Sequence, residues 1–331
     1  MVHDMSGPAL TCWVISDGRQ GIENQALGLA ESISHIQPLD IFKHVMATGK
    51  AFTAASPKMQ LKMRSDPAKY GLEAPYPSVA IGCGRQAIAP LLALKQKVPS
   101  VFTIYVQDPR IAASNFDLVI APEHDGLVGP NVISMIGSPN RINNTELIAN
   151  VLAFSDSLED LPMPRVAMLI GGDSSTHKMT KTAHVKHMKA ATDVLGSGRS
   201  VMITTSRRTP DWAVTEFEKL ARDNEDVWFY QGGDPNPYMA FLGSAETIMV
   251  TEDSTNMLTE ACTTGKHVFT LPMEGNPGKF KTLYDELAKQ CHMRPYETVF
   301  RNEPYKALNE TARVAALVKD RLQAVIKRKT G

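Results

Sequence analysis

Short apolar runs that alternate with helical stretches restrict the fold of this chain more than any other feature of its sequence. In the second half, five such runs alternate with helices, at residues 166–170, 201–204, 227–230, 248–251 and 267–271. Runs that are apolar at successive positions are typical of parallel strands buried on both faces. Right-handed crossovers place the intervening helices on the two faces of such a sheet. We therefore predict an α/β domain with a Rossmann-like parallel sheet.

The first half repeats this arrangement less regularly. Its apolar runs lie at residues 12–15, 39–45, 79–81, 101–106, 118–120 and 132–136, and its clearest helical stretches at 24–34 and 85–95. Residues 47–76 are small and polar, and they fit either a loop over a site or a surface insertion. This half therefore predicts a second Rossmann-like domain.

The chain has 331 residues, enough for two domains of ~100–200 residues each. An acidic segment with two prolines, residues 155–164, precedes a new strand and has the composition of a linker. We expect domains at 1–160 and 161–304, and a C-terminal helix at 305–331 that is free to cross back to the first domain. The expected architecture is two Rossmann-like α/β domains that face each other across a cleft.

Charge and cysteine content narrow the function classes. Lys and Arg together number 35, as do Asp and Glu, so no overall charge attracts nucleic acid and we expect no such partner. The four cysteines form no Cys-x-x-Cys pair, which argues against a disulfide framework or a zinc site. The first ten residues lack the pattern of a signal peptide, and no segment approaches the ~20 apolar residues of a membrane span. We expect a cytoplasmic protein and leave association with a membrane surface open.

In open α/β sheets, ligands bind beyond the carboxyl ends of the strands, so candidate residues are sought there. Four strand-end segments of the first half mix glycine or proline with charge: SDGRQG, GCGRQ, QDPR and PEHDG. One such segment fits an ordinary strand-to-helix turn, but four in equivalent positions should converge on one edge. The candidates for substrate binding are Gly18, Gly21, Arg85 and Arg110. The candidates for catalysis are His124, Asp17 and Asp108.

Two strand ends of the second half predict an anion site. Gly171, Gly172 and Ser174 follow a strand and open a helix that we expect at 176–195, where free N–H groups and the helix dipole favour an anion. The alternative is a glycine turn with a Ser or Thr N-cap. Thr205, Arg207 and Arg208 end the next strand, and guanidinium groups suit phosphate. Surface ion pairs are the alternative for the arginines.

A third strand end of this half carries Ser254 and, six residues on, Glu260. Ser254 or Asp253 can cap the helix that follows. The Glu260 carboxylate could accept hydrogen bonds from the two hydroxyls of a ribose. A solvated glutamate is the alternative, but the apolar neighbours Leu258 and Ala261 weaken it.

Several of these segments resemble the family named for plant mitochondrial fission, the elongated-mitochondria proteins, and its bacterial relatives. They are SDGRQGIENQALGLAE, GCGRQA, QDPR, FDLVIAPEHDGLVGPNV, IGG, TTSRRTP, NPY and VTEDSTNMLTEACTTGKHVF. The last segment also resembles the donor half of GT-B glycosyltransferases, in which a Ser-rich turn precedes a helix whose glutamate binds the nucleotide ribose. Ser254 and Glu260 occupy those places, and Gly171 and Gly172 match the donor glycine turn. The first glycine loop lacks the fuller glycine run of the acceptor domain.

Relatives are often labelled nucleoside-diphosphate-sugar epimerases, but an epimerase of the short-chain-dehydrogenase type needs two motifs that are absent here. The first is Gly-x-Gly-x-x-Gly after the first strand, where this chain has Asp-Gly-Arg-Gln-Gly. The second is a Tyr-x-x-x-Lys pair, and none of the eight tyrosines has a lysine four residues later.

The leading hypothesis is a GT-B-type transferase that uses a nucleotide-diphosphate sugar, with no metal and no cofactor. Arg207 and the N–H groups near Gly171 and Gly172 would hold the diphosphate. Glu260 would hold the ribose. The unknown acceptor would be deprotonated by His124, whose ordinary pKa of ~6.5 suits the task, with Asp17 and Asp108 as rivals.

Two alternatives stay open. One is a non-enzymatic adaptor with a protein partner, because the plant relatives are linked to the recruitment of a dynamin-like fission protein to the mitochondrial outer membrane. The other is a nucleotide-sugar sensor or hydrolase, which the lack of a clear catalytic base favours.

Overall fold

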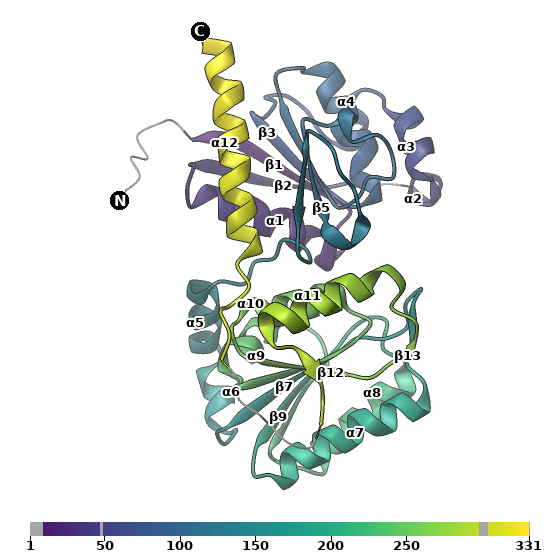
Figure 1. The fold of residues 1–331 in the computed structure, drawn as a ribbon, viewed down its shortest axis with the longest axis vertical. Helices are drawn as coiled ribbons and strands as arrows, with labels where there is room; N and C mark the ends of the chain where they lie inside the picture. The colour runs from purple at the N-terminus through teal and green to yellow at the C-terminus, as the bar shows by residue number, and fades with distance from the viewer. Residues whose placement is uncertain (1–8, 47–48, 298–303, 331) are drawn as a thin grey trace. The chain divides into compact units, whose positions relative to one another are not determined.

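A computed structural model describes residues 9–46, 49–297 and 304–330 (Figure 1). The chain divides into two compact units: Met1–Arg141 with Asn309–Gly331, and Ile142–Leu308. The division falls before α5 (Asn144–Ala153), whereas the sequence placed it near residue 160. Helix α5 belongs to the second unit because it packs against α9 (Tyr238–Ser244), where a Cβ on Gly243 would lie 2.6 Å from the Val151 side chain.

The first unit contains a six-stranded sheet in the order β2-β1-β3-β4-β5-β6, with every strand pair parallel. Its strands are β1 (Leu10–Ser16), β2 (Leu39–Val45), β3 (Val79–Cys83), β4 (Phe102–Val106), β5 (Leu118–Pro122) and β6 (Val132–Met135). Its main helices are α1 (Gln20–Ser34) and α4 (Ile88–Lys97). The ambiguous segment 47–76 contains α2 (Lys50–Ala54), α3 (Pro57–Met63) and the 3-10 helix η1 (Pro67–Tyr70). The predicted parallel sheet of this half is confirmed.

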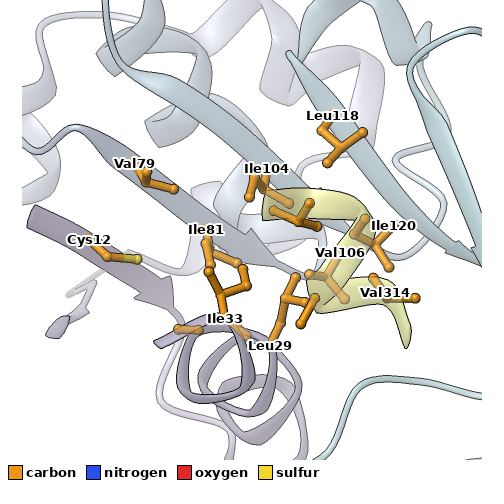
Figure 2. Close-up of a cluster of buried hydrophobic side chains, with 14 of the residues drawn as sticks. Cys12, Leu29, Ile33, Val79, Ile81, Ile104, Val106, Leu118, Ile120 and Val314 are labelled. Atoms are coloured by element: carbon orange, nitrogen blue, oxygen red, sulfur yellow. The ribbon is translucent and has the colours of Figure 1, made fainter. Parts of the chain in front are cut away.

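The C-terminal helix α12 (Glu310–Thr330) packs against α1 in this unit. Figure 2 shows Leu29 and Ile33 of α1 and Val314 of α12 against the same strands, and all three side chains are fully buried. The start of α12 is also anchored, because the Glu310 carboxylate accepts a hydrogen bond of 2.8 Å from the Ile136 N–H. The predicted return of this helix to the first domain is confirmed.

The second unit contains another six-stranded parallel sheet, in the order β10-β9-β7-β11-β12-β14. Its strands are β7 (Arg165–Ile170), β9 (Ser200–Thr205), β10 (Val227–Tyr230), β11 (Thr247–Thr251), β12 (His267–Leu271) and β14 (Arg294–Pro295). Its longer helices are α7 (Lys181–Gly196), α8 (Asp211–Arg222), α10 (Thr255–Thr263) and α11 (Lys281–Cys291). The five apolar runs of the sequence are thus strands of one sheet.

Two local predictions for this unit were wrong. The long helix begins at residue 181 and not at 176, because His177 and Lys178 form β8 and pair with β13 (Glu274–Gly275). The Thr180 side chain then caps α7 by accepting a hydrogen bond from the Ala183 N–H. The acidic segment 155–164 is not a plain linker, since its first part is helix α6 (Ser155–Glu159).

Within the described residues, no helix is long and apolar enough to cross a membrane. The four cysteines are buried and form no disulfide. In the same parts of the chain, no group of three or more His, Cys, Asp or Glu side chains could hold a metal ion. The expectation about a signal peptide concerns residues 1–10, most of which lie outside the described residues.

Candidate functional site

Polar side chains gather at the carboxyl edge of the first unit's sheet. Asp17, directly after β1, pairs with Arg19 at 2.6 Å and accepts a hydrogen bond of 2.9 Å from Gln86 Nε2. Burial alone would raise the pKa of Asp17, but the hydrogen bonds from Arg19 and Gln86 outweigh it and hold that pKa below its ordinary value. Arg85 donates to the backbone carbonyl of Thr53 at 2.6 Å. The loops after β1 and β3 are therefore joined to each other and to α2.

The two glycines of the first loop have roles in the backbone conformation of the loop and of the helix that follows. Gly18 has φ of +78°, a left-handed conformation that a side chain would strain, and a Cβ there would lie 3.1 Å from Val45. Gly21 lies in the first turn of α1, which begins four residues earlier than the predicted helix start, and its carbonyl accepts a hydrogen bond from Gln25 Nε2.

The loops after β4 and β5 meet through Arg110. Its guanidinium pairs with Asp108 at 3.0 Å and lies 3.8 Å from Asp125. Gln107 and Arg110 have φ of +89° and +57°, which costs a non-glycine residue roughly 1–2 kcal/mol. His124, half-buried, precedes Asp125 in the turn after β5. The expected convergence of the four loops on one edge is thus present.

Sequence reasoning missed the buried polar groups beneath these loops. The Gln25 side-chain oxygen accepts a hydrogen bond of 3.1 Å from Gln107 Nε2. The Glu23 carboxylate accepts one of 2.9 Å from Ser16 and pairs with Lys43 at 3.2 Å. The available signal was the polar first turns of an otherwise apolar helix, in which Glu23 and Gln25 turn out to be buried.

The glycine loop of the second unit does not present the expected anion site. The N–H of Gly171 donates to Thr251 Oγ1 at 2.7 Å, and that of Gly172 donates to Asp253 Oδ2 at 3.0 Å. The N–H of Ser174 donates to the carbonyl of His177 at 2.8 Å. These groups are engaged within the chain, and α7 begins several residues later. The geometry therefore opposes the diphosphate role that we expected for these N–H groups.

Neither Gly171 nor Gly172 can be replaced by a larger residue without a steric clash. A Cβ on Gly171 would lie 2.2 Å from Asp253 Oδ1, and one on Gly172 would lie 2.0 Å from the carbonyl oxygen of Arg208. Both distances are shorter than any non-bonded contact allows. The absence of a side chain at both positions leaves room for the Asp253 carboxylate and for the backbone of Arg208.

The paired arginines have different environments. Arg208 pairs at 2.7 Å with Asp253, whose side chain is fully buried, and also donates to the carbonyls of Gly172 and Asp173. For Arg208 the ion-pair alternative is therefore observed. Arg207 is exposed and forms no hydrogen bond or ion pair within the described residues. Thr205 is half-buried at the end of β9.

Glu260 lies in the second turn of α10, and Ser254 caps this helix by accepting a hydrogen bond from the Met257 N–H. Tyr238 donates a hydrogen bond of 2.5 Å to Glu260 Oε2. Burial raises the pKa of Glu260 to about 7, and the Tyr238 hydrogen bond opposes that rise. Part of the Glu260 side chain still contacts solvent. Tyr238 was not predicted, although it belongs to the NPY segment of the resemblance.

Two parallel six-stranded α/β sheets, with a C-terminal helix that returns to the first unit, define a GT-B-like fold. The sequence profile described as "Mitochondrial fission ELM1" matches residues 20–322. The chain therefore belongs to the mitochondrial fission ELM1 family.

Two curated relatives support this assignment. The mitochondrial fission protein ELM1 of Arabidopsis thaliana is 27% identical over 275 residues, which is 75% of this chain and 64% of the plant protein. The chain thus spans less than two thirds of that relative's length. The uncharacterized protein RP120 of Rickettsia prowazekii is 22% identical over 359 residues, and the match covers 94% of this chain and 98% of that protein.

Solved structures of the same fold are more distant in sequence. UDP-GlcNAc 2-epimerase from Methanocaldococcus jannaschii has a TM-score of 0.54 and 12% identity, covering 94% of this chain and all of that one. The Neisseria meningitidis UDP-GlcNAc 2-epimerase bound to UDP-GlcNAc has a TM-score of 0.51 and 12% identity, with coverage of 94% and 99%. MurG from Acinetobacter baumannii has a TM-score of 0.50 and 12% identity, with coverage of 97% and 93%.

Proposed function

We propose that this protein binds a nucleotide-diphosphate sugar at the carboxyl edge of its second unit and transfers the sugar to an acceptor without a metal ion. The observation that carries the proposal is the Glu260 carboxyl group, which is largely surrounded by protein and, within the described parts of the chain, accepts one hydrogen bond, from Tyr238. A carboxylate with one oxygen unoccupied by protein donors suits the adjacent hydroxyls of a ribose. Two solved structures of the same fold are UDP-GlcNAc 2-epimerases, one of them bound to UDP-GlcNAc, and they support this choice of ligand.

Arg207 is the proposed partner of the diphosphate. Its guanidinium is exposed at the end of β9 and has no protein partner within the described residues, whereas Arg208 is held by Asp253. Guanidinium groups bind phosphate oxygens in bidentate geometry and can stabilise a leaving diphosphate. Because the Gly171 and Gly172 N–H groups are engaged, the proposal gives the anion to Arg207 and not to the glycine turn.

For the acceptor we propose the carboxyl edge of the first unit, with His124 as the base. The pKa of Asp17 is lowered by its partners, which makes this carboxylate a weak base, and the Asp108 carboxylate is occupied by the Arg110 guanidinium. His124 belongs to the turn that carries Asp125, beside the Arg110 side chain.

The proposal is tested by isothermal titration calorimetry with UDP, GDP and ADP sugars. We expect one of them to bind to the wild-type protein, with at least tenfold weaker binding to Glu260→Gln and to Arg207→Ala. Arg222→Ala, which removes an exposed arginine of α8, is the matched control for charge. Failure of every nucleotide sugar to bind to the folded protein would reject the proposal.

A non-enzymatic adaptor role is the second candidate, favoured by membership of a family named for mitochondrial fission. In that case, a protein partner captured by the wild type should also be captured by Glu260→Gln. The transferase proposal predicts that this variant binds the nucleotide sugar at least tenfold more weakly. A sensor would bind the sugar nucleotide without cleaving it. A hydrolase would bind it and release free sugar when no acceptor is added.

A further inference from the structure

Tyr238 is the only hydrogen-bond donor to Glu260 within the described residues. It is the first residue of α9, after the loop that follows β10, whereas Glu260 lies on α10 after β11. The 2.5 Å hydrogen bond between them therefore joins the beginnings of two helices that both start at the carboxyl edge of the sheet. Burial raises the pKa of the Tyr238 hydroxyl well above its ordinary value, so it remains a donor throughout the neutral range.

Among the residues that the structure describes, the pKa of Glu260 is shifted first by burial and then by the hydrogen bond from Tyr238, with no contribution from a charged side chain. The titratable groups on the elements around α10 have other partners. Cys291 contacts Cys262, Tyr284 donates to the Glu252 carbonyl, Lys281 pairs with Asp285, Lys266 donates to the Ala245 carbonyl, and His267 responds to Glu246 and Arg294. Within the described residues, Tyr238 is therefore the side chain that opposes the effect of burial on the charge of Glu260.

We propose that Tyr238 is a positioning residue that holds Glu260 as a carboxylate and so makes ligand binding at this site depend on pH. When Glu260 is ionised, both of its oxygens accept, and the one that Tyr238 does not occupy can receive the ribose hydroxyls. When Glu260 is protonated, the site loses a charge-assisted acceptor. The part of this inference that concerns the ligand rests on the function proposed above.

The experiment compares the wild type, Tyr238→Phe and Glu260→Gln, each as the full chain. The Glu260 carboxyl carbon is titrated by ¹³C NMR without ligand, and UDP-GlcNAc binding is measured by calorimetry from pH 5.5 to 8.5. Because the hydrogen bond from Tyr238 favours the ionised carboxylate, Tyr238→Phe should raise the titration midpoint by about one pH unit. Affinity for UDP-GlcNAc should then fall about fivefold at pH 7 and recover most of that loss at pH 8.5.

Tyr284→Phe is the matched control. It removes another largely buried tyrosine hydroxyl from the same edge, one that donates to a backbone carbonyl and not to a carboxylate. Its Glu260 midpoint should equal that of the wild type. Glu260→Gln should bind weakly at every pH and show no dependence on pH in this range.

The outcomes separate the inference from the proposed function. An unchanged NMR midpoint in Tyr238→Phe overturns the inference, whether or not the ligand binds. A raised midpoint with a matching shift in the binding profile supports both. A raised midpoint in a folded protein that binds no nucleotide sugar overturns the proposed function and the ligand part of the inference, while it upholds the control of Glu260 by Tyr238.

Discussion

Replacement of Glu260 by glutamine should stabilise the protein at neutral and alkaline pH while it removes the proposed ribose contact. Burial raises the pKa of this carboxyl from an ordinary 4.5 to about 7 in the folded state. Folding therefore favours the protonated acid. The corresponding stability is complete below the unfolded-state value near 4.5 and is lost as the pH rises through about 7.

The size of the effect follows from the two values. The folded-state and unfolded-state pKa values of Glu260 differ by about 2.5. A pKa difference of one corresponds to about 1.4 kcal/mol, so the largest possible effect on the unfolding free energy is roughly 3 kcal/mol. Because part of the Glu260 side chain contacts solvent, we expect about 2 kcal/mol at pH 8. Glutamine has nearly the same shape, cannot ionise, and still offers an oxygen to Tyr238. The difference in unfolding free energy between Glu260→Gln and the wild type should therefore be smallest at pH 5, grow up to about pH 7 and level off towards pH 8.

Urea unfolding at pH 5, 6, 7 and 8 measures this difference. Tryptophan fluorescence reports mainly on the second unit, because Trp212 and Trp228 lie in it and Trp228 packs against Phe241. Glu225→Gln, which replaces an exposed glutamate of the same unit, is the control for the loss of one carboxylate. If Glu260→Gln gave a flat difference, or were less stable than the wild type at pH 8, the reasoning about burial and charge would be refuted.

Three further predictions concern the same unit. Asp253→Ala should lower the unfolding free energy by about 2–3 kcal/mol, measured by urea unfolding at pH 7, because Gly172 N–H and the Arg208 guanidinium lose their acceptor; an unchanged midpoint would contradict this. Gly172→Ala should cost more than about 3 kcal/mol or abolish folding, since its Cβ would lie 2.0 Å from a backbone oxygen, and circular dichroism with thermal melting checks it. His187 Nε2–H donates a hydrogen bond of 2.7 Å to the Pro272 carbonyl, and burial lowers the pKa of this imidazole to about 4. The stability that neutral His187 contributes is therefore present above about pH 6.5 and lost as the pH falls towards 4. Acid unfolding of His187→Gln should accordingly begin at a lower pH than that of the wild type.

The sheets could be predicted because parallel strands buried on both faces need apolar residues at every position, and this pattern is visible locally. The start of α7 could not be predicted, because it depends on a contact with residues that are distant in the sequence. His177 and Lys178 fit a helix by themselves, but they pair with Glu274 and Gly275 nearly a hundred residues later. Such a strand pair is decided by tertiary contact, which overrides local propensity.

The candidate sites show the same division. A glycine turn at a strand end could be recognised in the sequence, but the acceptors of its N–H groups could not. Asp253 lies 81 residues from Gly172, and no local sequence pattern around either residue predicts the hydrogen bond between them. Glu260 was identified from its spacing after Ser254, whereas Tyr238 was only one residue of a short motif. The hydrogen-bond partner of a buried polar group is determined by the fold. The sequence can therefore indicate which polar group is a candidate, but not which hydrogen bonds it forms.

The two carboxyl edges differ in what they leave for a ligand. At the first edge, Asp17 and Glu23 each receive both a cation and a neutral hydrogen-bond donor from the protein. At the second edge, Asp253 is occupied in the same way, but Glu260 has only Tyr238 and Arg207 has no partner within the described residues. Under the function proposed above, a ligand would offer hydroxyl donors to the carboxylate and an anion to the guanidinium. A sugar nucleotide carries both features in one molecule, and for that reason the second edge is the place to look for it.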